Sequence, residues 1–176
     1  MQNKIVLVGY MGTGKSAIGN ELSKLLNIDF IDLDGYIATQ EASEISTIFE
    51  EKGELYFRKK EKEALEQLLN SNRNFILATG GGTPCYYNSM KLISKKSISF
   101  FINTPLNILV ERLTKDKSKR PLIKHLNNDD LMEFIAKHLF ERNQFYQQAN
   151  YAITNNTTVN DAVKEIIKLL NSTTIH

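Results

Sequence analysis

The sequence predicts an α/β fold, a three-layer sandwich in which helices cover both faces of a five-stranded parallel sheet. Short apolar runs typical of strands alternate along the chain with longer segments of helical periodicity. This alternation favours parallel strands joined by crossover helices. The polar residues suited to chemistry follow the predicted strands at their carboxyl ends, which is where folds of this class bind ligands.

Length and composition suit one domain over residues 1–176. The chain is 41% hydrophobic, enough for a core and too evenly mixed for disorder. Its 22 basic and 20 acidic residues leave a formal charge of +2, which gives no support to a nucleic-acid or membrane partner. Cys85 is the single cysteine, and the sequence shows neither an export leader nor an apolar run of about 18 residues. We therefore expect a monomeric, cytoplasmic protein.

The chain opens with two predicted strands and the helices that follow them. Residues 5–8 form an apolar run short enough for a buried strand, and the helix over residues 15–26 gathers its apolar side chains on one face. Residues 30–32 predict a short second strand. Helical patterns then occupy residues 35–40, 45–52 and 54–69. Gly53 separates the last two because glycine commonly ends a helix.

Three more strands complete the predicted sheet. Residues 75–78 and 97–102 are apolar runs, and Pro105 opens the next helix, which extends to residue 113, because proline suits the first helical position. A polar, lysine-rich stretch over residues 114–128 predicts a loop. The last elements are a helix over residues 129–148, a strand over 151–153 and an amphipathic helix over 159–170.

The first predicted strand runs directly into a phosphate-binding motif. Residues 9–16 read GYMGTGKS and match G-x-x-x-x-G-K-[ST] between a strand and a helix. The glycines allow backbone N–H groups to turn toward anionic oxygens, and the helix adds its positive N-terminal end. Lys15 would reach the β- and γ-phosphates, and the Ser16 hydroxyl would hold Mg²⁺. The predicted ATP-binding residues of this segment are Gly12, Thr13, Gly14, Lys15, Ser16 and Ala17.

Two other interpretations of this segment stay open. The run Gly12-x-Gly14-x-x-Ala17 also fits the looser dinucleotide fingerprint, with Asp32 near the position of a ribose-binding acid. A glycine-rich turn with no ligand is the second. Gly9 and the Lys15-Ser16 pair favour a nucleoside triphosphate, because a pyrophosphate turn needs neither of them.

The third strand ends in Thr79 and glycines, so it supplies no acid for a metal. The second strand ends in Asp32-Leu33-Asp34, and in extended geometry two carboxylates two residues apart project to the same side. One would steady Mg²⁺ and the other would orient an attacking hydroxyl. The alternative is an Asx turn with a helix cap, since aspartate favours both.

Six motifs lie between residues 9 and 146. They are the loop of residues 9–16, Asp32-x-Asp34, Phe49-x-x-x-Gly53-Glu54-x-x-Phe57-Arg58, Gly80-Gly81-Gly82, Arg120-Pro121-Leu122 and Arg142-x-x-x-Tyr146. In this order and at this spacing, the motifs resemble those of the shikimate kinase family. The resemblance implies a P-loop fold of the nucleoside-monophosphate-kinase type and ATP-dependent phosphorylation of the 3-hydroxyl of shikimate.

The resemblance also assigns roles to residues of this chain. It implies that helices over residues 33–61 form the shikimate-binding region. The residues implied to hold shikimate are Asp34, Arg58, Gly80, Gly81, Gly82 and Arg142. Ser16 and Asp32 would serve Mg²⁺. Arg120 would close over the ATP phosphates from a lid over residues 114–128, and the catalytic set would be Lys15, Asp34 and Arg120. Arg112 and the Asn155-Asn156 segment would lie near the adenine.

Each acceptor residue also has a plainer interpretation. Arg58 has Glu54 and Glu61 at helical spacing, which predicts helix-surface ion pairs. Arg142 has Glu141 and His138 nearby, and the three glycines would serve as a flexible turn. The lysine-rich loop would also suit a nucleic-acid patch or a solvated connection, but its place between two helices and its Arg120-Pro121 pair favour a lid. One departure from the family pattern is Ala17, where many relatives carry a second hydroxyl.

Two rival functions remain at this level. A gluconate- or nucleotide-directed kinase would share the loop and lid but gives no reason for the set of acceptor residues. A non-catalytic nucleotide switch is the second, yet the sequence has no guanine-reading Asn-Lys-x-Asp motif, because Thr114-Lys115-Asp116 places its acid one position early.

Overall fold

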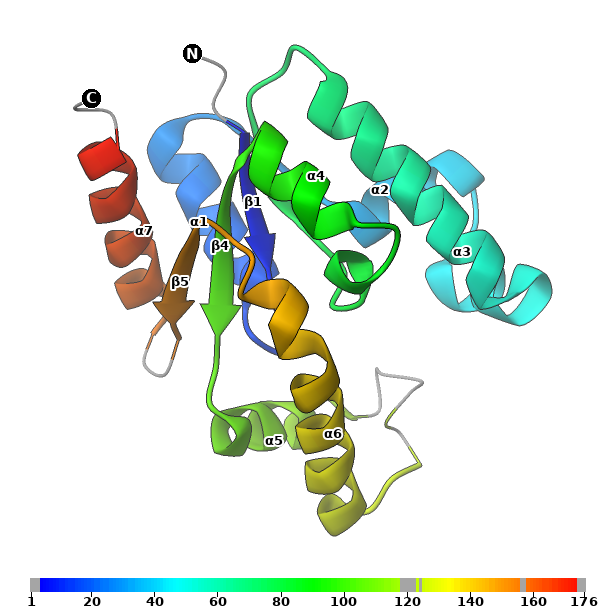
Figure 1. Cartoon of the computed structure of the whole chain (residues 1–176). Helices are drawn as coiled ribbons and strands as arrows, with labels where there is room; N and C mark the ends of the chain where they lie inside the picture. The colour runs from blue at the N-terminus through cyan, green and yellow to red at the C-terminus, as the bar shows by residue number, and fades with distance from the viewer. Residues whose placement is uncertain (1–3, 118–122, 124, 156–157, 174–176) are drawn as a thin grey trace.

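A computed structural model describes residues 4–117, 123, 125–155 and 158–173 of the chain. It contains one parallel five-stranded sheet with the order β2-β3-β1-β4-β5. Figure 1 shows β1, β4 and β5 of this sheet. The strands are β1 (Lys4–Val8), β2 (Asp29–Asp32), β3 (Phe75–Ala78), β4 (Ile98–Asn103) and β5 (Tyr151–Thr154). All five predicted strands are therefore present, and the predicted fold class is confirmed.

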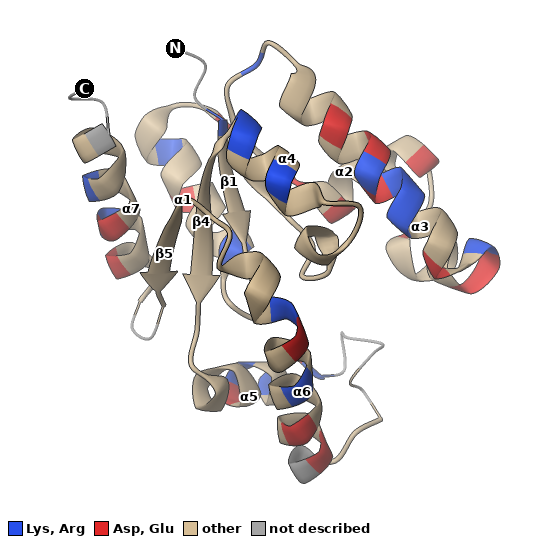
Figure 2. Ribbon diagram, in the orientation of Figure 1, with Lys and Arg blue, Asp and Glu red and all other residues tan. Residues whose placement is uncertain are grey.

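Helices cover both faces of this sheet. The helices α1 (Lys15–Leu26) and α7 (Val159–Thr173) pack on one face. The other face and the carboxyl end carry α2 (Leu33–Glu41), α3 (Ile45–Asn70), α4 (Ser89–Lys96), α5 (Leu106–Lys115) and α6 (Asn128–Tyr146). Figure 2 shows basic and acidic residues interspersed along α3, in keeping with the small net charge.

Two core clusters follow from the pleat of β1. Ile5 and Leu7 join the cluster under α1 and α7, whereas Val6 and Val8 join the cluster on the opposite face. All four side chains are at most 2% exposed, because a central parallel strand is covered on both sides. Burial on both faces therefore explains why residues 5–8 form an uninterrupted apolar run in the sequence.

The structure tests two predictions about helices. Gly53 adopts φ 78° and ψ 170°, a non-helical backbone that breaks α3 at a kink, so the two helices predicted on either side of it are both present. The sequence predicts no element between residues 83 and 96, but α4 lies there, preceded by a short 3-10 turn over Thr83–Cys85. The helix α4 has eight residues, and Met90 and Ile93 are its buried apolar side chains. That pattern is too short to show a period.

Two further expectations are corrected. The extended geometry expected for Asp32-Leu33-Asp34 is wrong, because β2 ends at Asp32 and α2 begins at Leu33. The loop expected over residues 114–128 starts later, since α5 continues to Lys115. Ile123, within that stretch, is 0% exposed and belongs to a core cluster, so this part of the expected lid packs against the body of the protein.

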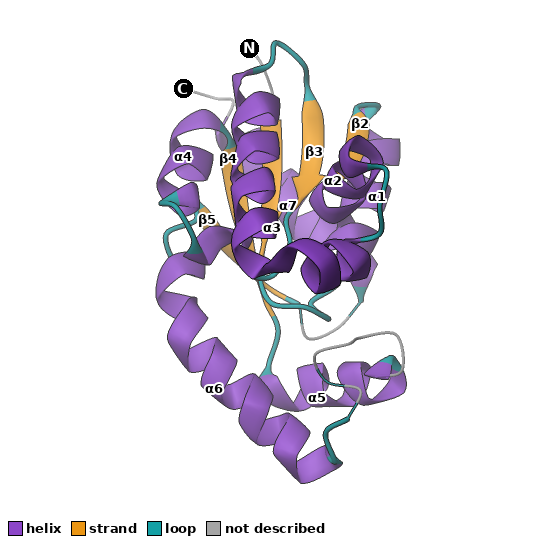
Figure 3. Cartoon of the chain, turned by 90° about the vertical axis from the view of Figure 1, so that its right-hand side faces the viewer, coloured by secondary structure: helices purple, strands orange, loops and turns teal. Residues whose placement is uncertain are grey.

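The topology brings several predicted site residues together. The strands β2, β3 and β1 are neighbours, and their carboxyl ends lead into Asp32, the glycine turn and the phosphate-binding loop. In Figure 3, α5 and α6 extend beyond this end of the sheet. The candidate site therefore lies where parallel α/β sheets bind ligands.

Candidate active site

The loop of residues 9–14 has a backbone that only glycine adopts readily. Gly9, Gly12 and Gly14 have φ angles of 145°, 81° and 88°. A Cβ on Gly9 would lie 2.7 Å from the carbonyl oxygen of Ile102, so space as well as conformation excludes a side chain there. Gly14 is the N-cap of α1, and within the described residues its helix start has no side-chain cap. The first turn of α1 can therefore present backbone N–H groups to an anion.

Lys15 directs its ammonium group into this loop. Its side chain is buried, and Nζ donates hydrogen bonds of 2.8 Å to the carbonyl oxygens of Gly9 and Tyr10. Charge-assisted hydrogen bonds of this kind fix the cation at the position where the motif predicts phosphate contact. The lysine thus belongs to the loop and not to the hydrophobic core.

Distant residues brace the same loop. Asn155 is 1% exposed, and its Nδ2 donates to the Thr13 carbonyl oxygen at 2.7 Å. Arg112 on α5 donates from Nη1 to the Gly12 carbonyl oxygen at 3.3 Å. Both residues therefore contact the phosphate-binding loop, and their place beside the adenine stays a prediction. Asn156 lies outside the described residues.

Asp32 serves two of the interpretations that the sequence leaves open. Its Oδ1 accepts from the Gly35 N–H at 3.3 Å, which makes it the N-cap of α2. Its Oδ2 accepts from the Ser16 hydroxyl at 2.9 Å. A hydroxyl and a carboxylate oxygen together fit Mg²⁺, which takes one or two protein oxygens and completes its shell with phosphate and water. The described residues contain no cluster of three His, Cys, Asp or Glu side chains that would hold a metal by itself.

Asp34 lies between the phosphate-binding loop and the side chains predicted to hold the acceptor, because the charges of both Lys15 and Arg58 act on it. It sits in the first turn of α2, and its Oδ1 is buried with no hydrogen-bond partner among the described residues. Burial raises the pKa of this carboxyl to about 6, and the negative charges of Glu61 and Asp32 act in the same direction. Lys15 and Arg58 lower the pKa and so oppose that shift. Because its Oδ1 has no donor among the described residues, this carboxylate can accept a proton or a hydroxyl hydrogen bond.

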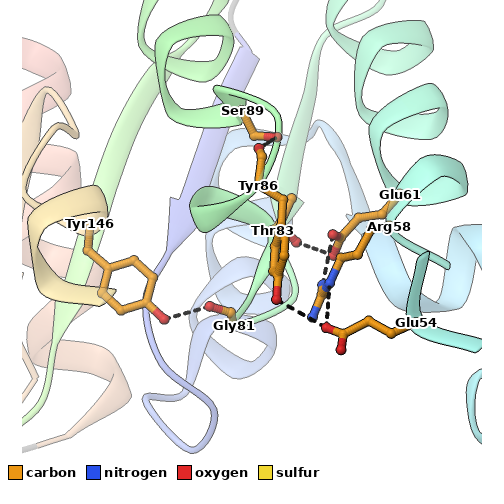
Figure 4. A network of polar contacts seen from close by, with 8 residues as sticks. All are labelled: Glu54, Arg58, Glu61, Gly81, Thr83, Tyr86, Ser89 and Tyr146. Carbon is orange, nitrogen blue, oxygen red and sulfur yellow. Dashed lines mark hydrogen bonds and ion pairs between the residues drawn. The ribbon is translucent and has the colours of Figure 1, made fainter. Parts of the chain in front are cut away.

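Arg58 is paired, as its helical spacing predicts, but its pair with Glu61 is buried. Nη1 donates to Glu61 Oε2 at 2.9 Å and Nε to Glu54 Oε1 at 3.3 Å. The side chains of Arg58 and Glu61 are only 11% and 3% exposed. The Thr83 hydroxyl donates to Glu61 Oε1 at 2.6 Å, so both oxygens of this buried carboxylate have a partner (Figure 4). The guanidinium also stacks on the Tyr86 ring, 4.3 Å from its centroid.

The glycine turn after β3 packs between these groups. A Cβ on Gly82 would lie 2.6 Å from Arg58 Nη2, and a Cβ on Gly80 would lie 3.0 Å from Asp34 Oδ1. A Cβ on Gly81 would meet the backbone nitrogen of Met11 at 3.2 Å. These close approaches give the three glycines a packing role that a merely flexible turn would not need.

Arg142 reaches the site from α6. Its guanidinium lies 5.7 Å from the centroid of the Tyr10 ring, and the Tyr10 hydroxyl contacts His138 Nδ1 at 3.1 Å. Among the described residues no ion pair joins Arg142 to Glu141. Burial raises the pKa of the Cys85 thiol, and the charges of both Arg142 and Arg58 oppose that rise. Cys85 follows the glycine turn, so the two arginines approach this turn from α6 and from α3.

Some of the site was missed in the sequence. Glu61 is visible there only as a surface partner of Arg58, yet it also contacts Thr83 and raises the pKa of Asp34. The contacts of Tyr10 with His138 and of Asn155 with Thr13 join residues more than a hundred positions apart, for which the sequence carries no signal. Arg120, the predicted lid residue, lies outside the described residues.

This fold and site define a P-loop phosphotransferase whose nucleotide loop adjoins the glycine turn and the arginines of α3 and α6. A family model described as shikimate kinase matches residues 11–171. The chain is 47% identical to the shikimate kinase of Flavobacterium psychrophilum, over 95% of this chain and 98% of that protein. The chain belongs to the shikimate kinase family.

Solved structures agree with this assignment. The crystal structure of shikimate kinase from Bacteroides thetaiotaomicron has a TM-score of 0.91 and 33% identity, covering 96% of this chain and 98% of that one. The shikimate kinase of Acinetobacter baumannii in complex with shikimate has a TM-score of 0.89 and 30% identity, covering 100% and 97%. The fold is thus of the nucleoside-monophosphate-kinase type that the sequence predicts. Among the described residues, no helix has the length and apolar character needed to cross a membrane.

Proposed function

We propose that the protein transfers the γ-phosphoryl group of ATP to the 3-hydroxyl of shikimate, giving 3-phosphoshikimate and ADP. This step leads toward chorismate and the aromatic amino acids. Membership of the shikimate kinase family supports the proposal. The observation that carries it is the position of Asp34, whose buried carboxylate lies under the influence of Lys15 from the nucleotide loop and of Arg58 from the acceptor side.

The nucleotide half supplies charge for the transferring group. The loop of residues 12–17 binds the phosphates through backbone N–H groups, and Lys15 exchanges its two carbonyl partners for phosphate oxygens. Arg120 is proposed to add a second positive charge from the lid. Because the transition state of phosphoryl transfer is loose, stabilising charge on the phosphate oxygens and holding the reactants in line matter most.

Ser16 and Asp32 are proposed to hold Mg²⁺, for which their two oxygens are suited. When bound with ATP, the ion would neutralise negative charge on the phosphates.

The acceptor half supplies geometry. Arg58 and Arg142 are proposed to hold the carboxylate of shikimate, because the planar guanidinium matches a carboxylate in two-point hydrogen bonding. Gly80, Gly81 and Gly82 allow the ring to approach the backbone closely. Asp34 accepts the hydrogen bond of the reacting hydroxyl and orients its oxygen toward the γ-phosphorus.

A coupled assay of ADP release with shikimate, quinate, gluconate and AMP as acceptors tests this proposal. We expect steady turnover with shikimate that needs ATP and Mg²⁺, and a ³¹P spectrum of the product that places phosphate on the 3-hydroxyl. Turnover with gluconate or AMP in place of shikimate would favour the rival kinases. ATP binding without any acceptor-dependent turnover would favour a nucleotide switch.

Three further expectations belong to this proposal. We propose that the chain acts as a single domain with an acceptor region over residues 33–61 and a lid over 114–128, as a monomer, and in the cytoplasm, where ATP is available. Gel filtration with light scattering tests the monomer.

A further inference from the structure

The Tyr146 hydroxyl joins α6 to the glycine turn. It donates to the Gly81 carbonyl oxygen at 2.5 Å, while the whole residue is 0% exposed. Figure 4 shows the ring of Tyr146 reaching the turn from one side and the Arg58 network lying on the other. Tyr146 itself stacks on Phe101 of β4, with ring centroids 5.3 Å apart. The sheet therefore fixes the ring, and the ring fixes the position of the hydroxyl.

The same residue lies beside a proposed acceptor contact. Arg142 and Tyr146 are four residues apart on α6, so they share a face of the helix. Burial raises the pKa of the Tyr146 phenol, and the positive charge of Arg142 opposes this rise. The hydroxyl therefore stays protonated as a donor at neutral pH, close to the Arg142 guanidinium.

All three carbonyl oxygens of the turn are engaged by internal donors. The Thr83 and Cys85 N–H groups bond to Gly80 and Gly82 at 3.3 and 2.9 Å. Gly81 receives its donor from Tyr146, a residue 65 positions away. The two neighbouring carbonyls are thus fixed by the turn itself, whereas the orientation of the Gly81 carbonyl depends on one distant side chain.

This orientation matters because a peptide unit is planar. A trans peptide directs its carbonyl and its N–H to opposite sides, so a Gly81 carbonyl held toward α6 points the Gly82 N–H away from α6. A peptide between two glycines rotates with little steric cost when nothing holds it. In the rotated orientation its carbonyl oxygen would replace an N–H donor at the turn and would repel an anion.

We infer that Tyr146 is a positioning residue for the acceptor carboxylate: its hydroxyl holds the Gly81–Gly82 peptide so that the glycine turn offers an N–H donor on the side of Arg58. The inference rests on the proposed function, and it gives the last residue of the Arg142-x-x-x-Tyr146 motif a task distinct from core packing. Tyr146 acts through Gly81 and does not itself need to touch shikimate.

The experiment compares Tyr146→Phe with the wild-type protein and with Tyr151→Phe, which removes a hydroxyl from β5 at a ring stacked on Phe100. The acceptors are shikimate and its methyl ester, which lacks the negative charge. In Tyr146→Phe we expect the KM for shikimate to rise about tenfold, as loss of one good hydrogen bond implies, with kcat and the KM for ATP within about twofold. The ratio of kcat/KM for shikimate to kcat/KM for the methyl ester should fall below its wild-type value by a similar factor. Tyr151→Phe should match the wild type.

A purely structural role for Tyr146 predicts that kcat falls equally for both acceptors while the KM for shikimate stays unchanged. An equal fall in kcat, or an unchanged KM for shikimate, overturns the inference. If Tyr146→Phe does not fold, the Gly82 amide proton of the wild type decides: a marked downfield shift on adding shikimate supports the inference, and no shift overturns it. Absence of both shikimate binding by calorimetry and turnover in the wild type would remove the proposed function and this inference together. Normal wild-type activity with an unaltered Tyr146→Phe would overturn the inference alone.

Discussion

Lys15 and Arg58 bring positive charge to the two halves of the site, but different groups hold them. Lys15 bonds to neutral carbonyl oxygens of its own loop, no more than six residues away. Arg58 bonds to two carboxylates, one of which is almost completely buried and has a second donor in Thr83. The nucleotide half is thus a local device of consecutive residues, whereas the acceptor half is a network assembled from α2, α3, the glycine turn and α6.

The difference separates two tasks. Neutral carbonyls release a cation to phosphate oxygens at modest cost, so the lysine can follow charge as the phosphoryl group moves. The buried carboxylate of Glu61 holds the guanidinium in one orientation, since a buried charge without its partner is strongly destabilising. We therefore expect changes on the nucleotide side to affect mainly kcat, and changes on the acceptor side to affect mainly the KM for shikimate.

The largest effect is expected on the nucleotide side. Lys15→Met keeps the length of the buried stem but removes the ammonium group. We expect kcat to fall about 10³-fold or more, because stabilisation of charge on the transferring phosphoryl group is lost. Circular dichroism should show an intact fold. The control is Lys24→Met, at an exposed ion pair with Glu21. Near-normal turnover of Lys15→Met at saturating ATP would refute the assignment of the loop.

The next largest effect is expected at Asp34, where the two halves meet. The pKa of about 6 predicts that wild-type kcat/KM for shikimate falls as the pH drops below about 6, since the protonated carboxyl no longer accepts the hydroxyl proton. Asp34→Asn should lose about 10²-fold or more in kcat and should lack this acidic limb. If only the KM for shikimate rises, Asp34 is a binding group and the orienting role is wrong.

The stability of the same variant provides a control with a defined sign. The pKa of Asp34 is raised from 3.8 to about 6 on folding, so ionising this group costs the folded state. The cost is absent below about pH 4, grows between pH 4 and 6, and is complete above pH 6. Asp34→Asn should therefore be more stable than the wild type by about 1 to 3 kcal/mol at pH 8. The two proteins should unfold at similar temperatures near pH 4.

The arginines test the acceptor side at intermediate size. Arg58→Lys and Arg142→Lys keep the positive charge but lose the planar fork. Each should raise the KM for shikimate about ten- to a hundredfold and leave the KM for ATP nearly unchanged. Calorimetry with shikimate gives the same comparison without turnover. Unaltered shikimate affinity in both variants would mean that neither arginine holds the carboxylate of shikimate.

The same contrast explains what the sequence could predict. The loop of residues 9–16 is contiguous, and its strand and helix have clear periodicity, so its position follows from local pattern. The ion pairs of Arg58 follow from helical spacing, but their burial does not, because Thr83 and Tyr86 come from the segment after β3. The acceptor set as a whole came from the resemblance to a family. Its roles stay predictions until they are tested.

Two errors have local physical causes. The extended pair expected at Asp32 and Asp34 failed because Asp32 caps a helix that begins one residue later. The helix α4 was missed because two buried apolar residues in eight positions do not establish a period. Contacts such as Tyr146 with Gly81 depend on how α6 crosses the sheet end, which no short window of sequence encodes.

The smallest expected effect sharpens the comparison most, because it moves Arg58 without changing it. Gly82 has φ −89° and ψ −22°, a conformation open to alanine, so Gly82→Ala brings no backbone strain. Its Cβ would lie 2.6 Å from Arg58 Nη2, and that guanidinium is held by Glu61 and Glu54, so the side chain must shift. We expect the KM for shikimate to rise a few-fold to about tenfold, while kcat and the KM for ATP stay within about twofold.

The control must be a glycine that accepts a side chain without strain. Gly53→Ala is no control, since Gly53 has φ 78°. Gly35→Ala is suitable, because its Cβ would meet only Asp32 Cβ at 3.9 Å. A fall in kcat with unchanged KM for shikimate in Gly82→Ala would mean that Arg58 acts on the phosphoryl group, and the division between the two halves would not hold.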